Sequence, residues 1–155
     1  MMRAQGDLLA RHAIDLLSAA LRHIRDAEHL LEAGSHASFD QAYHLAGFAP
    51  ECARKATLPM RWLDKAIGHS VDTLAEDVVR LIEAIDPTAS RYAPPSYTQG
   101  YPALKAWAVE CRYKRTGTYT RAEAEALCKE ARKAVDAVVI ALWTDGRIPD
   151  KEALW

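Results

Sequence analysis

Apolar residues recur at steps of three and four along much of the chain, a spacing that predicts helices with one buried face. The longest series lies in a helix expected from about Asp7 to Ala33 and closed by Gly34. Its inward positions are Leu9, Ala13, Leu16, Ala20, Ile24, Ala27 and Leu31. Because the sequence has no alternating run of β-branched residues, no strand is expected and the predicted fold class is all-α.

Four more helices are expected after the first. They cover about residues 39–57, 70–85, 102–113 and 121–143. Ser38 is a suitable cap for the first of these, and Thr120 with Glu123 has the pattern of a capping box before the last. Residues 87–102 hold four prolines and three tyrosines and are expected to form an ordered loop. The sequence therefore predicts an up-and-down bundle of about five main helices in one domain, residues 1–155.

The composition is ordinary for a globular domain, with 50% of the residues apolar, 26% charged and a formal net charge of −1. This balance gives no whole-molecule attraction to nucleic acid or membrane. The charge is uneven, however, since Cys111–Arg121 contains four basic residues and no acidic one. The three cysteines form no close pair, which favours a reducing compartment. The longest apolar stretch, Ala137–Trp143, is too short to span a bilayer, so we expect a cytoplasmic protein.

Residues 42–56 place two stripes on the second predicted helix. The expected apolar face consists of Ala42, Leu45, Ala49, Cys52 and Ala56. Tyr43, Gly47, Glu51 and Lys55 recur every four residues and lie roughly opposite that face. This second stripe is either a solvated surface with an ordinary Glu51–Lys55 pair or one wall of a polar cleft. Gly47 favours the cleft, because a glycine inside a helix costs about 1 kcal/mol relative to alanine and so indicates a close approach to the backbone.

Three motifs together resemble the HEPN family. Residues 42–56 read Ala-Tyr-x-Leu-Ala-Gly-Phe-x-x-Glu-x-x-x-Lys-Ala, Gly68-His69 precedes the third predicted helix, and Arg112-Tyr113 lies late in the chain. The resemblance spans roughly residues 7–143. It implies a helical bundle that is often dimeric. Many members of the family are ribonucleases or partners of small nucleotidyltransferases, and others are non-catalytic modules that bind RNA or nucleotides.

The catalytic motif of the family is missing from its usual place. Catalytic members carry an arginine, four to six further residues and a histidine near the start of a late helix. Here Arg112 is present, but residues 113–155 contain no histidine. Arg22 and His29 match the spacing, yet they lie on the first predicted helix. The resemblance therefore implies a module without the family's ribonuclease chemistry.

The leading hypothesis is a HEPN-like module that binds a nucleotide or RNA. The residues expected to contact phosphate are Arg112, Lys114 and Arg115, and those expected to contact base or sugar are Tyr43, Tyr113 and Glu51. Cations and aromatic rings in one segment suit phosphate contact combined with base stacking. Lys55 and His69 complete the predicted ligand-binding set. A solvated turn with buried tyrosine rings is the alternative interpretation of residues 112–119.

Two other classes of function fit the same residues. One is a small-molecule enzyme in which Glu51 or His69 serves as acid or base beside Lys55, although His69 is also placed to support a helix terminus. The other is an interaction module whose docking surface is the apolar end of the last helix, residues 138–143. A homodimer is expected, because it would cover this surface and because members of the HEPN family are often dimeric. The resemblance also implies a nucleotidyltransferase-type protein as a second partner.

No cofactor and no metal site is predicted. Metal sites in helical bundles usually draw carboxylates from several helices, and the sequence has no Glu-x-x-His repeat. The nearest approach to a ligand set is His23, Asp26 and His29, spaced by three residues on one helix. The cysteines lack ligand spacing and are expected to be inert thiols.

Overall fold

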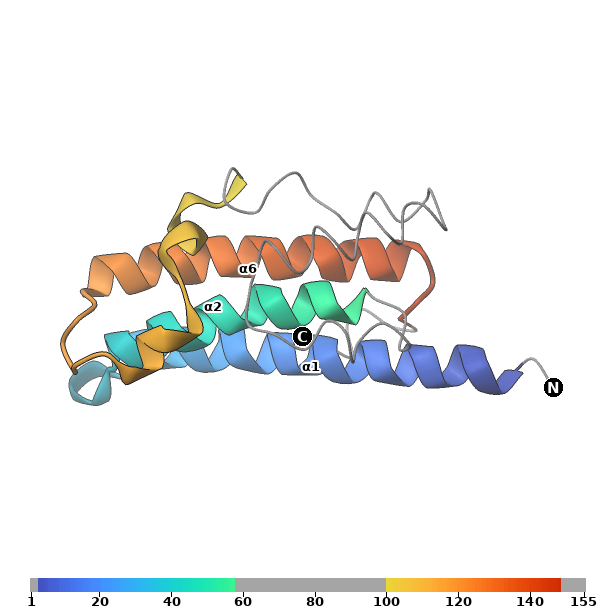
Figure 1. Ribbon diagram of the computed structural model, residues 1–155, viewed down its shortest axis with the longest axis horizontal. Helices are drawn as coiled ribbons and strands as arrows, with labels where there is room; N and C mark the ends of the chain where they lie inside the picture. The colour runs from blue at the N-terminus through green and yellow to red at the C-terminus, as the bar shows by residue number, and fades with distance from the viewer. Residues whose placement is uncertain (1–2, 58–99, 149–155) are drawn as a thin grey trace.

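The structure, a computed structural model, describes residues 3–57 and 100–148. Its elements are α1 (Arg3–Glu32), the 3₁₀ turn η1 (Gly34–His36), α2 (Phe39–Ala56), the 3₁₀ helices η3 (Pro102–Ala106) and η4 (Val109–Tyr113), and α6 (Arg121–Thr144). Figure 1 shows the three α-helices side by side, with α1 running opposite to α2 and α6. The helix predicted at 70–85, most of the loop predicted at 87–102 and His69 lie outside the described residues.

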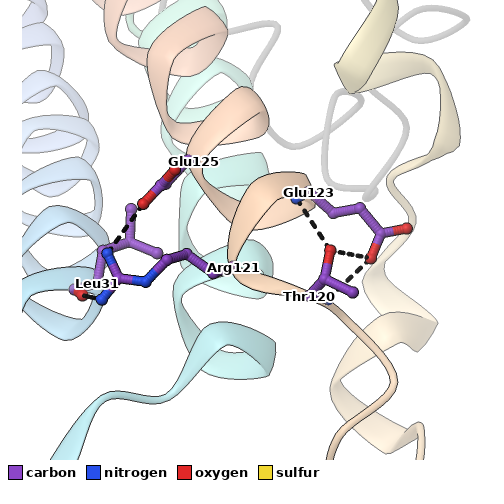
Figure 2. Close-up of polar contacts among 5 residues, drawn as sticks. All are labelled: Leu31, Thr120, Arg121, Glu123 and Glu125. Carbon is purple, nitrogen blue, oxygen red and sulfur yellow. Dashed lines mark hydrogen bonds and ion pairs between the residues drawn. The ribbon is translucent and has the colours of Figure 1, made fainter. Parts of the chain in front are cut away.

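Local capping signals place the ends of the helices. The Ser38 hydroxyl accepts a hydrogen bond from Gln41 N at 3.4 Å and begins α2. At the start of α6, Thr120 Oγ1 accepts from Glu123 N at 3.2 Å, while the Glu123 carboxylate accepts from Thr120 N at 2.8 Å (Figure 2). Gly34, with φ of 59°, follows α1 as expected. The predicted cap and capping box are therefore confirmed.

Small side chains on α2 form the centre of the core. Five alanines at alternating steps of four and three are fully buried: Ala42, Ala46, Ala49, Ala53 and Ala56. They allow α1 and α6, which both pack against α2, to approach its backbone closely. Of the predicted apolar face, Ala42, Ala49 and Ala56 are fully buried, while Leu45 and Cys52 are partly buried and pack against the core. Because α2 is covered on more than one side, its smallest residues occupy the closest contacts and these larger ones lie at the edge.

Branched and aliphatic residues of the outer helices fill the rest of the core. Leu17, Leu21 and Ile24 of α1 are at most 1% exposed. The predicted inward series of α6 is confirmed, since all of its members are buried: Leu127, Ala131, Ala134, Val138 and Leu142. The all-α prediction is thus confirmed for the part of the chain that the structure describes.

The prediction of five main helices is wrong for the described residues, which contain three α-helices and short 3₁₀ segments. Residues 102–113 were expected to form one α-helix and instead form η3 and η4, separated by extended backbone at Trp107 and Ala108. The break falls at Trp107, whose side chain packs against α2. At the start of the segment, the Glu130 carboxylate of α6 accepts from Ala103 N at 2.7 Å and Leu104 N at 3.3 Å, N–H groups that the first turn of an α-helix would also leave without an internal partner.

Two arginines of α6 join it to the other helices. Arg132 forms a bidentate pair with Glu28 of α1, with nitrogen–oxygen distances of 2.9 and 2.6 Å. Arg121 donates to the Leu31 carbonyl at the end of α1 at 3.0 Å (Figure 2). The Arg121 guanidinium also lies 5.3 Å from the ring centroid of Phe39, the first residue of α2. One side chain thus contacts the end of α1 and the start of α2.

The apolar end of α6 is only partly covered. Val138, Val139 and Leu142 are buried, whereas Ile140 is 49% exposed and Trp143 is 48% exposed. The two exposed side chains lie three residues apart, so they are neighbours on the helix surface. None of the helices in residues 3–57 and 100–148 is long and apolar enough to cross a membrane.

Candidate functional site

Residues 101–119, which we call the strap, carry most of the predicted ligand-binding residues. Figure 1 shows the strap beginning over α6, passing beside α2 and then leading into the start of α6. Its first part is held by Glu130, as described above. The Asp40 carboxylate of α2 holds its last part, accepting from Gly117 N at 2.8 Å and from Tyr119 N at 3.0 Å. Two carboxylates on different helices therefore fix the two ends of the strap.

The middle of the strap packs on Gly47. The Trp107 indole N–H donates to the His44 carbonyl at 3.1 Å, and a Cβ added to Gly47 would overlap the indole ring. The close approach indicated by this glycine is therefore real, and Trp107 of the same chain makes it. Phe48 contacts the Trp107 ring edge-on at a centroid distance of 5.1 Å. The covered face of α2 is thus a packed aromatic contact between α2 and the strap.

His44 and Cys111 form a buried pair that the sequence analysis did not single out. The His44 Nδ1 and Cys111 Sγ atoms lie 3.3 Å apart, and both residues are at most 7% exposed. Burial and the nearby Arg112 guanidinium lower the pKa of His44, while burial raises the pKa of the Cys111 thiol. These shifts favour a neutral imidazole and a neutral thiol. A thiolate nucleophile activated by histidine requires the opposite shifts, so the geometry supports a structural pair.

Tyr43 is buried beneath the strap. Its ring stacks on that of Tyr119 with a centroid distance of 3.8 Å and an interplanar angle of 10°. Burial raises the pKa of Tyr43 to about 12. The Lys114 ammonium lies 5.8 Å from the Tyr119 ring centroid. Tyr43 is therefore linked, through Tyr119, to the basic part of the strap.

Glu51 and Lys55 lie further along α2. Their carboxylate and ammonium groups are 2.5 Å apart, and the side chains are 4% and 18% exposed respectively. Eight residues separate Glu51 from Tyr43, which corresponds to about 12 Å along a helix. Neither Tyr43 nor Glu51 is bathed in solvent, but the two do not meet in one place. The predicted second stripe is thus divided between a strap contact and a separate ion pair.

Arg112, Tyr113, Lys114 and Arg115 form an exposed run, which we call the basic–aromatic segment. Tyr113 is 75% exposed, the largest exposure among the bulky apolar side chains of the described residues. The Arg112 guanidinium lies 4.6 Å from the Tyr113 ring centroid. The neighbouring Cys111 is buried, so the segment projects from an anchored position. The structure thus brings together three cations and one accessible ring.

The remaining predicted residues fall elsewhere. Arg22 and His29 are both exposed on α1, the first helix of the chain. Across the residues that can be described, no group of three metal-ligating side chains is found, and His23, Asp26 and His29 do not form one. Burial raises the pKa of the Cys52 thiol to about 11 and that of Cys128 to about 12, in keeping with unreactive thiols.

Comparison with known proteins adds no family assignment. No protein-family model, no curated protein and no solved structure matches the chain.

Proposed function

We propose that the protein is a HEPN-like module that binds a nucleotide or RNA on the basic–aromatic segment and lacks the family's ribonuclease chemistry. The observation that carries this proposal is the exposed Tyr113 ring with the Arg112 guanidinium over it, next to Lys114 and Arg115. Resemblance of residues 42–56 to the HEPN motif supports the same function.

The chemistry of the segment suits a single-stranded ligand. Arginine and lysine bind phosphate through charge-assisted hydrogen bonds, and an accessible aromatic ring stacks on a base of any identity. Such stacking contributes about 1–3 kcal/mol per base. Tyr43 supports this surface from beneath through Tyr119. Direct contact is therefore assigned to the four exposed residues and a supporting role to Tyr43.

Loss of the Arg112 guanidinium tests the proposal. With a fluorescein-labelled oligouridylate as probe, we expect Arg112→Ala to weaken binding about tenfold or more, since one charge-assisted contact is worth about 1.5–3 kcal/mol. The salt dependence of wild-type binding should have a logarithmic slope of about −2, because three cations contact a single strand. Fluorescence anisotropy measures both quantities.

A matched control removes the same charge from another surface. Lys133 is exposed on α6, and Lys133→Ala is expected to leave affinity and slope unchanged. Thermal unfolding of Arg112→Ala should match that of the wild type, because Arg112 is exposed. If Arg112→Ala and Lys133→Ala bind equally well, or if Arg112→Ala unfolds, the segment is not the ligand site.

We also propose that a second copy of the chain covers the end of α6. The exposed Ile140 and Trp143 support this, as does the resemblance to a family that is often dimeric. Sedimentation velocity should show a dimer for the wild type, a shift toward monomer for Ile140→Glu, and no shift for Arg22→Glu, which changes an exposed residue of α1. A wild-type monomer at every concentration would contradict the proposal. A nucleotidyltransferase-type partner stays a prediction from the resemblance.

A further inference from the structure

His44 makes two separate links between α2 and the middle of the strap. Its imidazole contacts the Cys111 thiol, and its backbone carbonyl accepts from the Trp107 indole. The imidazole is also enclosed by rings, with the Phe48 centroid at 4.7 Å and the Trp107 centroid at 6.4 Å. One residue of α2 therefore contacts both Trp107, which lies between η3 and η4, and Cys111 of η4.

The groups around this imidazole do not favour a positive charge. Arg112 of η4 and His23 of α1 both act on His44, and each is cationic when charged. The direct partner on the strap, Cys111, is a neutral thiol. A proton on His44 thus places a positive charge near the Arg112 guanidinium in a buried, ring-lined position, where desolvation disfavours it.

We propose that the strap is a pH-dependent latch: protonation of His44 releases residues 107–113 from α2 while the three α-helices stay packed. The carboxylates of Glu130 and Asp40 hold the strap on either side of these residues and act as the fixed ends of the movement. In the open state the imidazole reaches water and accepts the proton at its ordinary affinity. The inference concerns the fold and stands whether or not the basic–aromatic segment binds nucleic acid.

Proton linkage sets how much the equilibrium constant for opening of the strap changes with pH. Opening takes up one proton at pH values between the lowered pKa of the closed state and the ordinary histidine pKa of about 6.5. In this range the opening constant rises by up to about tenfold for each unit of pH decrease. Above it, opening is independent of pH.

Native-state hydrogen exchange on the intact chain tests the latch. Three strap amides donate to carbonyls within the strap and report its opening: Trp107 N, Cys111 N and Lys114 N. Their protection factors, which already correct for the intrinsic pH dependence of exchange, should fall by up to about tenfold between about pH 6.5 and about pH 5.5. Amides inside α1, α2 and α6 should stay better protected than the strap amides at both pH values, because the helices remain packed when the strap opens.

The variant His44→Asn removes the titrating ring and keeps the backbone carbonyl, so its strap protection should not depend on pH. Cys111→Ala is a second variant, expected to lower protection at neutral pH and to retain the pH dependence through His44. Equal wild-type protection at both pH values would overturn the proposal. So would strap protection equal to that of the helices at both pH values, which would mean that the strap opens only when the whole protein unfolds, or an unchanged pH dependence in His44→Asn.

Discussion

Gly47 is the one glycine in residues 16–57 and 100–148 at which an added Cβ would meet other atoms. The Trp107 indole occupies the space and donates its N–H to the His44 carbonyl. A helix would otherwise gain about 1 kcal/mol from alanine at such a position. Glycine at position 47 therefore lowers the helix propensity of α2 but leaves room for the strap to pack against it.

We predict that Gly47→Ala destabilises the protein despite this gain. Overpacking against a fixed ring costs about 1–3 kcal/mol, and the displaced indole also loses its hydrogen bond, worth about 0.5–1.5 kcal/mol. Urea denaturation should therefore show a net loss of about 1–3 kcal/mol. Gly100→Ala is the matched control, because nothing lies within 4 Å of a Cβ there. In a Trp107→Leu background the cost should shrink, and an undiminished cost would contradict the explanation.

At the scale of elements, helix ends were predictable and the strap was not. Ser38 and the Thr120–Glu123 capping box act within one turn, so their signal is local and readable in the sequence. Leu104, Trp107 and Cys111 are buried at steps of three and four, the spacing of an α-helix. They form 3₁₀ segments instead, with extended backbone at Trp107, where the indole packs on Gly47 of α2, a tertiary contact that no local pattern reveals.

We predict that Asp40→Ala frees the last part of the strap without unfolding the helices. Its carboxylate is the acceptor for Gly117 N and Tyr119 N, and Gly117, with φ of 88°, lies in a turn. Hydrogen bonds to a charged group contribute about 1.5–3 kcal/mol, so exchange of these two amides should accelerate about tenfold or more. Asp40→Asn keeps one acceptor oxygen and should restore part of the protection. Unchanged exchange in Asp40→Ala would show that the hydrogen bonds to Asp40 do not stabilise the turn.

At the scale of the whole molecule, side chains distant in sequence decide how the helices are joined. Arg121 reaches the end of α1, and Arg132 pairs with Glu28 across more than a hundred residues of chain. The sequence indicates that these arginines lie on a helix, but not which helix they contact. The same limit applies to the candidate site, where the exposed run 112–115 was recognised and the buried His44–Cys111 pair was missed. Histidine and cysteine 67 positions apart carry no shared periodicity.

Global stability should decrease on mild acidification. Burial lowers the pKa of both His23 and His44 below the ordinary value of 6.5. The unfolded chain therefore binds more protons than the folded one at pH values between the lowered values and about 6.5, and the free energy of unfolding rises with pH in that range. The stabilisation from the neutral imidazoles is complete above about pH 6.5 and is lost as the pH falls through the folded-state values.

Urea midpoints measured at several pH values from about 7.5 to about 5 test this sign. The wild-type midpoint should be flat at the upper end and then decline with pH. His23→Gln separates the two histidines, because His23 belongs to α1 and does not contact the strap thiol. It should remove part of the decline while leaving the pH dependence of strap exchange in place. A urea midpoint that rises on acidification would mean that the folded protein binds more protons than the unfolded chain. That result would contradict the lowered pKa values of the two buried imidazoles.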